Sequence, residues 1–182
     1  MTGPTVLTII RMILSVIFMV FALIPAAWSR ILALIIFIIG SLTDLIDGKW
    51  ARKKQIVTDL GAFLDPLADK MLVNLAFLVL VYVYMIPIWV FAIILVRDFA
   101  VDGMRMMAAR EGKTISASYL GKLKTTFQMT ALIILLFNLI YRIEFFVVLG
   151  QIALYLALAL TVLSGADYLI KGWKNILKRT KK

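Results

Sequence analysis

Cysteine and histidine are both absent from the 182-residue chain, and only four prolines and ten glycines interrupt it. The absence of cysteine excludes disulfide bonds, thiolate metal sites and cysteine nucleophiles. The absence of histidine excludes imidazole bases and the usual zinc ligands. Charge is also scarce, because Asp, Glu, Lys and Arg together make up 16% of the residues. Any acid–base or metal chemistry in this protein must therefore use carboxylates.

Apolar residues are the abundant class, at 63% of the chain with a mean hydropathy of +1.01. An ordinary soluble domain is about half apolar and about a quarter charged. The composition therefore predicts an integral membrane protein, and the length allows a single domain over residues 1–182. The 20 Lys and Arg residues outnumber the 10 Asp and Glu residues. In a membrane protein this surplus favours cytoplasmic loops that meet anionic membrane lipids, rather than a nucleic-acid partner.

The uncharged stretches do not correspond one to one with membrane-spanning helices, which need about 20 residues each. Ile31–Thr43 is too short to cross a bilayer, whereas Met71–Val96 is too long for one helix and contains Pro87. Both difficulties disappear if the helices extend into the charged segments that flank these stretches. The sequence then predicts an all-α fold of six transmembrane helices, at residues 5–25, 30–52, 61–84, 87–109, 119–141 and 146–170.

The placement of basic residues predicts how these helices are oriented. Lys53 and Lys54 fall between the second and third helices, Arg110 and Lys113 fall between the fourth and fifth, and a basic tail follows the sixth. Cytoplasmic segments of membrane proteins are enriched in Lys and Arg, so we expect both termini in the cytoplasm. The charged helix segments then lie in the inner leaflet, where ionisable groups usually line a water-filled cavity. We expect a polar chamber that opens to the cytoplasm.

Four aspartates are the strongest candidates for chemistry in that chamber. Asp44 and Asp47 are three residues apart and Asp65 and Asp69 are four apart, so each pair shares one helix face. Four carboxylates at membrane depth need compensation, which hard divalent cations with oxygen ligands provide. Mg²⁺ or Mn²⁺ suits carboxylate and phosphate ligands, and paired metals recur in displacement reactions at phosphorus. The alternative is that the aspartates are interfacial charges paired with the nearby lysines Lys53, Lys54 and Lys70.

The same segment carries a family resemblance. Residues 44–69 contain the pattern D-x2-D-G-x2-A-R-x8-G-x3-D-x3-D without a gap, which resembles the signature of the CDP-alcohol phosphotransferase family. Pro4–Arg11 is similar to the P-N-x-L-T-x-x-R opening of the phosphatidylglycerophosphate synthase branch, with Thr5 where asparagine is frequent. Further segments similar to that branch are Asp65–Lys70, Val96–Val101 (with Asp98 where glutamate is frequent), Gly121–Thr125 and Leu163–Gly165.

The resemblance implies a reaction and a set of site residues. The phosphatidyl group of CDP-diacylglycerol would pass to sn-glycerol 3-phosphate, giving phosphatidylglycerophosphate and CMP. Asp44, Asp47 and Asp65 would ligate two divalent cations, Mg²⁺ or Mn²⁺, and Asp69 would be both a ligand and the catalytic base. The residues expected to bind the CDP group are Gly48, Ala51, Arg52, Thr58, Gly61 and Thr8. A homodimer in the bacterial cytoplasmic (inner) membrane is also implied, with its active site facing the cytoplasm.

The acceptor must be recognised by residues outside the signature. Glycerol 3-phosphate is a dianion, so its pocket needs cations. Arg97 and Arg105 are eight residues apart and share a helix face, whereas Lys122 and Lys124 diverge by about 200°. We expect both arginines, and only one of the two lysines, to face the acceptor phosphate. The alternative is that these cations reach the membrane surface from the cytoplasmic helix ends. We expect Asp98 and Asp102 to orient these arginines rather than to bind metal.

Two other functions fit parts of the pattern. A sibling transferase, namely a cardiolipin, phosphatidylinositol-phosphate or phosphatidylserine synthase, would share the signature and differ in its acceptor. A divalent-cation transporter would use the aspartates as part of its path. A conducting path also needs polar groups through the outer leaflet, and Leu75–Val81 and Val90–Leu95 are wholly apolar. The sequence therefore favours the enzyme over the transporter.

Overall fold

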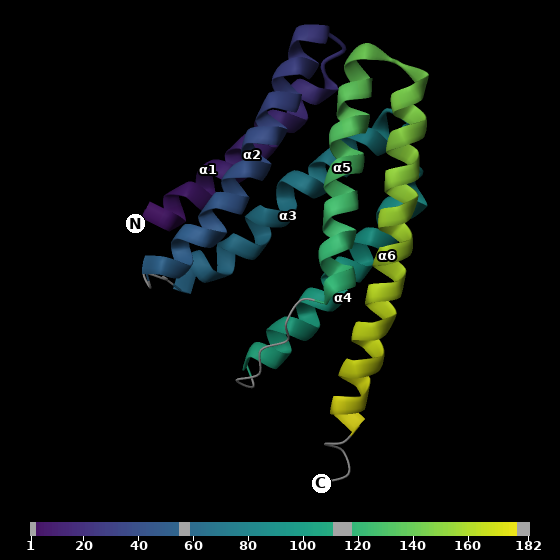
Figure 1. Ribbon diagram of the computed structural model, residues 1–182. Coiled ribbons are helices and arrows are strands. Elements are labelled where there is room, and N and C mark those ends of the chain that lie inside the picture. The colour runs from purple at the N-terminus through teal and green to yellow at the C-terminus, as the bar shows by residue number, and fades with distance from the viewer. Residues whose placement is uncertain (1–2, 55–58, 111–117, 178–182) are drawn as a thin grey trace.

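The computed structural model describes the backbone of residues 3–54, 59–110 and 118–177 (Figure 1). Within these ranges, side chains are described for residues 8–43, 67–68, 70–108 and 118–166. The described chain forms six helices: α1 (Gly3–Leu23), α2 (Ala27–Lys54), α3 (Asp59–Tyr82), α4 (Ile88–Arg110), α5 (Tyr119–Tyr141) and α6 (Glu144–Leu177). The all-α fold expected from the sequence is confirmed. The helix bounds lie close to the predicted ones, except that α6 continues to Leu177 rather than ending near 170.

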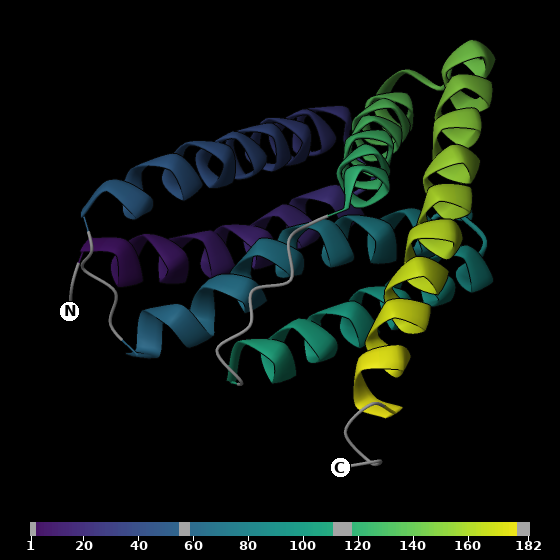
Figure 2. The ribbon, with the colours of Figure 1, turned by 60° about the horizontal axis from the view of Figure 1, so that its bottom comes forward.

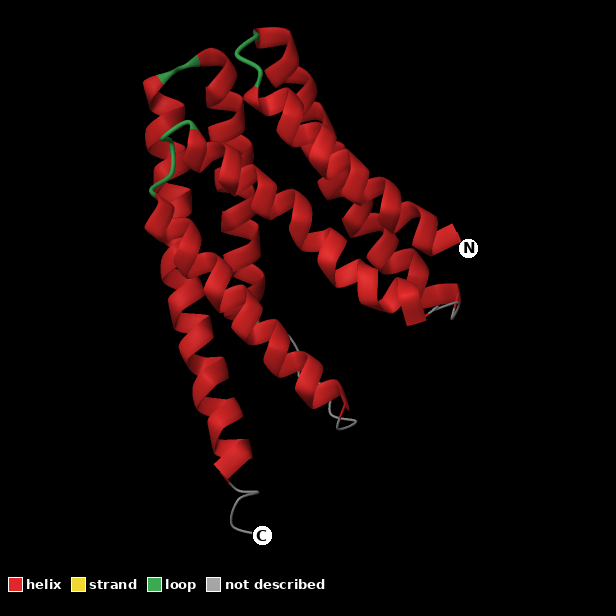
Figure 3. Cartoon of the chain, turned by 180° about the vertical axis from the view of Figure 1, so that it is seen from behind, coloured by secondary structure: helices red, strands yellow, loops and turns green. Residues whose placement is uncertain are grey.

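Successive helices run in opposite directions. The connections α1–α2, α3–α4 and α5–α6 lie toward one end of the molecule, drawn in green in Figure 3. The first residues of α1 and the last residues of α2, α4 and α6 lie toward the opposite end, which Figure 2 brings forward. We call this opposite end the terminal end. In Figure 2, α1 lies between α2 and α3, and it packs against both.

Proline and capping residues set several helix ends. Pro25 follows α1 and Pro87 precedes α4, positions where the missing N–H of proline is tolerated. Ser118 caps α5 by accepting a hydrogen bond from the Gly121 N–H at 3.1 Å. At the other end of α5, Arg142 has a φ of 55°, and the Asn138 side chain accepts a hydrogen bond from the Ile143 N–H at 2.7 Å. These residues mark the end of α1, the start of α4 and both ends of α5.

Buried aromatic and aliphatic side chains hold the helices together. Phe18 of α1 meets Phe37 of α2, and Phe77 of α3 stacks on Phe91 of α4, each pair with ring centroids 5.6 Å apart. Helices in membranes associate through close packing, which small residues allow. A Cβ added at Gly150 of α6 would lie 2.6 Å from a methyl carbon of Leu135 in α5, so glycine is needed for that approach.

Two helices of the described chain are long and apolar enough by themselves to cross a bilayer, namely Tyr119–Tyr141 and Glu144–Ala166. Shorter apolar segments occupy Thr8–Leu23, Ala27–Thr43 and Lys70–Tyr82. In α2 and α3 the apolar part is followed or preceded by the charged residues of the signature. The helices therefore combine apolar and charged lengths, which is the combination that the sequence predicted.

Candidate functional site

A cluster of charged side chains from α3, α4 and α5 is centred on Asp98. The ammonium group of Lys124 donates to both carboxylate oxygens of Asp98, at 2.8 Å and 2.7 Å. The Arg97 guanidinium donates from Nη1 to Asp98 Oδ1 at 3.1 Å. Asp98 and Arg97 are neighbours on α4, whereas Lys124 comes from α5. One carboxylate therefore holds two cations from different helices side by side.

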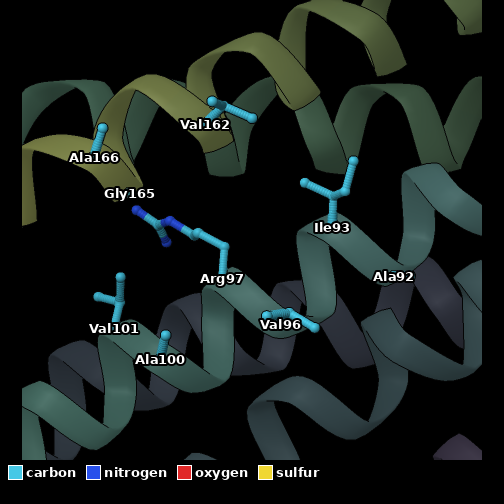
Figure 4. A pocket seen from close by; sticks show the side chains of 9 residues that line it. All are labelled: Ala92, Ile93, Val96, Arg97, Ala100, Val101, Val162, Gly165 and Ala166. Atoms are coloured by element: carbon cyan, nitrogen blue, oxygen red, sulfur yellow. The ribbon is translucent and has the colours of Figure 1, made fainter. Parts of the chain in front are cut away.

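Arg97 also links α4 to α6. Its Nη2 donates to the Ser164 hydroxyl oxygen at 2.8 Å. Gly165 lies directly against the side chain, because a Cβ added there would be 2.9 Å from Arg97 Cγ. Figure 4 shows the Arg97 side chain extending from α4 toward α6 beside Gly165. The absence of a side chain at Gly165 thus gives the arginine its path between the two helices.

The chain of contacts reaches α3 through Lys70. Its ammonium group forms an ion pair with Asp102 and lies 3.5 Å from the Asp98 carbonyl oxygen, both on α4. Arg105, one turn further along α4, is close enough to act electrostatically on Lys70. Lys70 directly follows Asp69, the last residue of the aspartate signature. The acidic signature and the charged cluster are therefore joined at adjacent residues of α3.

The cluster has a surplus of positive charge. Lys70, Arg97, Arg105 and Lys124 supply four cations, while Asp98 and Asp102 supply two carboxylates, and all are partly or fully shielded from solvent. Two unit charges 4 Å apart repel by about 4 kcal/mol at an effective dielectric constant of about 20. A cluster with this surplus favours an anion, and guanidinium and ammonium groups are the usual donors to phosphate.

The structure brings together three of the four cations predicted to meet the acceptor phosphate. Arg97, Arg105 and Lys124 belong to the cluster, and Lys124 is 4% exposed. Lys122 is exposed on the surface of α5. This arrangement agrees with the expectation that only one of the two lysines faces inward. Contact of any of these residues with an acceptor stays a prediction.

The residues predicted to bind metal and CDP lie mostly outside the described side chains. Asp44 and Asp47 belong to α2, and Asp65 and Asp69 belong to α3, so their backbones are helical. Asp47 and Asp65 lie about 10 Å along the axis from the terminal ends of their helices, and Asp44 and Asp69 about 15 Å. The two pairs thus occupy matching levels. The other predicted residues whose side chains lie outside the described part are Gly48, Ala51, Arg52 and Gly61, and Thr58 lies outside it entirely.

No group of three or more acidic side chains suited to a metal ion occurs among the side chains that the structure does describe. The metal prediction therefore depends on the four signature aspartates. Their donor set fits a hard divalent cation, because carboxylate oxygens are the ligands that Mg²⁺ and Mn²⁺ prefer. The backbone positions of the two aspartate pairs, at matching levels of their helices, are compatible with shared ligation.

Thr8 occupies a buried polar face of α1. It is 3% exposed, and Arg11 and Ser15 follow it on the same face, at 8% and 0%. Arg11 was not among the predicted site residues, although the spacing of Thr8, Arg11 and Ser15 at three and four residues could have indicated a common inward face. Lys70 was predicted only as a partner of the aspartates, and Ser164 only as part of a similar segment. Contacts between helices show that Lys70 and Ser164 belong to the charged cluster around Asp98 and Arg97.

A groove of about 500 Å³ lies beside Arg97, between α4 and α6. Most of its lining is apolar, and Arg97 is the charged residue in it. The labelled side chains in Figure 4 are Ala92, Ile93, Val96, Arg97, Ala100, Val101, Val162 and Ala166, with Gly165 on the α6 backbone. Arg97 thus lines an apolar groove and also belongs to the charged cluster.

Gly165→Ala tests the path of Arg97. The new methyl group would be 2.9 Å from Arg97 Cγ, so the arginine must shift and lengthen its bonds to Ser164 and Asp98. A side chain can give way at a cost of about 1–3 kcal/mol. We expect a fall in thermal stability of the purified protein, measured by tryptophan fluorescence. Gly103→Ala is the control, since a Cβ there meets nothing within 4 Å. Equal stability of the two variants would contradict the assignment.

Comparisons with known proteins agree with the resemblance seen in the sequence. Residues 1–163 match the family model described as CDP-alcohol phosphatidyltransferase. A protein of Bacillus subtilis (strain 168) named CDP-diacylglycerol–glycerol-3-phosphate 3-phosphatidyltransferase is 40% identical over 186 residues, covering 95% of this chain and 96% of that protein. Proteins with the same name from Yersinia enterocolitica and Pectobacterium atrosepticum are 36% and 39% identical, each covering 96% of this chain and 97% of their own length.

Proposed function

The chain belongs to the CDP-alcohol phosphatidyltransferase family, and we propose that it is the enzyme that transfers a phosphatidyl group from CDP-diacylglycerol to sn-glycerol 3-phosphate. The products are phosphatidylglycerophosphate and CMP, and the pathway served is phospholipid biosynthesis. The relatives' names support both the donor and the acceptor. The observation that carries the acceptor assignment is the cationic cluster of Arg97, Arg105 and Lys124 beside the aspartate signature.

Acceptor recognition is the part of the proposal that the described side chains support most directly. Glycerol 3-phosphate differs from serine by carrying a dianionic phosphate, which gains more from a cationic pocket than a zwitterion does. Arg97 supplies a guanidinium whose Nη1 donates to Asp98 and whose Nη2 donates to Ser164, and Lys124 supplies an ammonium group with three donors. Two of the Lys124 donors are directed at Asp98, which leaves the third for a ligand. We propose that the phosphate of the acceptor binds at this cluster.

The donor lipid is assigned to the aspartate signature. Asp44, Asp47, Asp65 and Asp69 would hold two Mg²⁺ or Mn²⁺ ions, and Gly48, Ala51, Arg52, Thr58, Gly61 and Thr8 would bind the CDP group. When bound, the cations neutralise negative charge on the pyrophosphate and on the departing CMP. Family membership supports dependence on a divalent metal. The proposal rests on the matching levels of the two aspartate pairs and on their oxygen donors.

The reaction requires one proton transfer and one displacement. Asp69 takes the proton from an acceptor hydroxyl, whose oxygen forms a bond to the lipid-side phosphorus. The bond from that phosphorus to CMP breaks, and CMP leaves with the electron pair. Arg97 and Lys124 hold the acceptor by its phosphate, so that the hydroxyl is presented in line with the departing group. Such positioning supplies a large share of the rate enhancement in bimolecular reactions.

The proposed setting is a bilayer that all six helices cross, with both termini on the cytoplasmic side. Large apolar side chains are exposed along the helices, among them Ile13 at 55%, Val20 at 51% and Leu163 at 60%, which favours contact with lipid. Tyr82, Tyr84, Trp89, Tyr141 and Phe145 are also exposed and lie near the connections α3–α4 and α5–α6, as expected for aromatic anchors at the outer interface. A bacterial inner membrane fits the relatives' organisms. The homodimer stays a prediction.

Acceptor choice is the decisive test of this function. Purified full-length protein in lipid–detergent micelles, with MgCl₂ or MnCl₂, would be given CDP-diacylglycerol and one of four acceptors. We expect CMP release with glycerol 3-phosphate and only background release with serine, inositol phosphate or phosphatidylglycerol. Release that depends on one of the last three, and not on glycerol 3-phosphate, would assign the chain to a sibling transferase instead.

A further inference from the structure

We propose that Asp98 is a positioning residue for the acceptor, and that it acts by holding Arg97 and Lys124 in register as a two-cation phosphate clamp. The inference rests on the proposed function, because it assigns a role within the acceptor site. It extends that function because it gives the carboxylate of Asp98 a role in binding the acceptor phosphate, which is itself an anion. An isolated carboxylate there would repel the ligand, so its presence requires a reason.

The contacts of Asp98 supply that reason. Both carboxylate oxygens accept from Lys124 Nζ, at 2.8 Å and 2.7 Å, and Oδ1 also accepts from Arg97 Nη1 at 3.1 Å. A carboxylate has about four acceptor positions, so three of them are engaged by these cations. The negative charge is therefore directed at the two cations, and the group of three keeps a charge of +1. An arriving phosphate meets the cations rather than the carboxylate.

Lys124 in particular needs such a partner. Its side chain is 5% exposed, so its ammonium group has little access to water. A buried charge without a partner is strongly unfavourable, and a lysine has a flexible four-carbon stem that permits many conformations. Asp98 compensates the positive charge of Lys124 and holds the lysine side chain in one conformation. A clamp that is already assembled when the acceptor arrives avoids the entropy cost of assembling it during binding.

Arg97 is fixed from the other side. Nη2 donates to the Ser164 hydroxyl at 2.8 Å, while Gly165 leaves room for the stem. With Nη1 on Asp98 and Nη2 on Ser164, the guanidinium plane is held between α4 and α6. The Asp98 carbonyl oxygen lies 3.5 Å from the Lys70 ammonium of α3. Lys70 of α3 and Lys124 of α5 thus meet Asp98, while Ser164 of α6 meets Arg97, so the contacts converge on two adjacent residues of α4.

A metal-binding role for Asp98 is disfavoured by the same contacts. Arg97, Lys124 and Lys70 all lie at hydrogen-bond distance from Asp98, and a divalent cation would be repelled by these three positive charges. The nearby Asp102 is paired with Lys70 in the same way. The two carboxylates of this stretch of α4 therefore serve cations of the protein, in contrast to the four aspartates of the signature.

The test compares Asp98→Asn with Asp98→Glu in the full-length protein in micelles. CMP release is measured while glycerol 3-phosphate is varied at saturating CDP-diacylglycerol, and then with the roles reversed. We expect Asp98→Asn to raise KM for glycerol 3-phosphate by about tenfold, as losing charge-assisted hydrogen bonds does. We expect KM for CDP-diacylglycerol and kcat to change by less than about threefold. Asp98→Glu, which keeps the carboxylate, should recover most of the lost affinity.

Two further variants make the result specific. Glu144→Gln removes an exposed carboxylate at the first turn of α6, beside the α5–α6 connection and far from the terminal end. This variant should match the wild type in both KM values. Lys124→Met should raise KM for glycerol 3-phosphate. Adding Asp98→Asn to the Lys124→Met variant should raise this KM by a smaller factor than Asp98→Asn does in the wild type. Residues that act through one another are non-additive in this way.

Three results would overturn the inference. One is an Asp98→Asn variant with an unchanged KM for glycerol 3-phosphate, and another is an equal rise in KM for both substrates, which indicates general damage to the fold. The third is full additivity with Lys124→Met. Failure of the proposed function is seen separately, as a wild-type enzyme that releases no CMP with glycerol 3-phosphate. That result would remove the acceptor on which the inference depends.

Discussion

Asp69→Asn is expected to lower kcat for CMP release by about 10³-fold, because it removes both a metal ligand and the group that takes the acceptor proton. Loss of a general base alone typically costs about 10²–10⁴-fold. The helix should be retained, since asparagine has nearly the same size as aspartate and Asp69 lies within α3. The measurement is CMP release at saturating concentrations of both substrates, with MgCl₂ or MnCl₂ titrated for each protein.

Glu144→Gln is the matched control for this substitution, because it neutralises one carboxylate far from the signature. A thermal unfolding midpoint close to that of the wild type would show that Asp69→Asn has folded. Activity of the folded variant within tenfold of the wild type would exclude Asp69 as base and ligand. It would then favour the alternative that the signature aspartates are interfacial charges.

Arg97→Gln is expected to lower kcat/KM for glycerol 3-phosphate by about 10²-fold, mainly through KM. A hydrogen bond to a charged group contributes about 1.5–3 kcal/mol, and about 1.4 kcal/mol corresponds to a factor of ten. The guanidinium is placed by Asp98 at 3.1 Å and Ser164 at 2.8 Å, so its loss removes a fixed donor. Initial rates at several glycerol 3-phosphate concentrations provide the measurement.

Arg97→Lys separates charge from geometry. A lysine keeps the positive charge but lacks the planar fork, so we expect it to recover only part of the loss. KM for CDP-diacylglycerol should stay within about threefold in both variants. A larger change for the donor lipid than for glycerol 3-phosphate would assign Arg97 to the CDP-diacylglycerol site, and the acceptor clamp would be wrong.

The six helices were predictable because the sequence was divided on the requirement that a membrane-spanning helix has about 20 residues. Ile31–Thr43 is too short to cross a bilayer, so the predicted helix was extended into the charged segment that follows, and α2 does end at Lys54. Prolines at 25 and 87 marked two of the boundaries. The end of α6 was missed, because the prediction stopped where the apolar run stops. A helix need not end where its apolar run ends, and the backbone of α6 is helical to Leu177.

The candidate site was predictable in part. Helical spacing placed Arg97 and Arg105 on one face, and it separated Lys122 from Lys124. It also suggested that Asp98 orients an arginine; Arg97 does donate a hydrogen bond to Asp98, and the orienting role stays a prediction. The contact of Asp98 with Lys124 and that of Arg97 with Ser164 depend on how α4 is rotated and tilted against α5 and α6. Such rotations are set by packing between helices, and spacing along one helix carries no information about them.

In the proposed bilayer setting, the buried charges and the exposed apolar helix sides together would determine how the two substrates arrive. Exposed side chains such as Ile13, Val20 and Leu163 favour contact with lipid, while the Asp98 cluster lies among the helices rather than on a loop. In that setting a diacyl lipid would reach the proposed site by lateral diffusion in two dimensions and would not need to leave the bilayer. Its effective concentration is a mole fraction of the surrounding lipid, whereas that of the acceptor is an ordinary aqueous molarity. Diluting the bilayer with inert phospholipid should therefore lower the rate of CMP release, because it lowers the mole fraction of CDP-diacylglycerol around the protein.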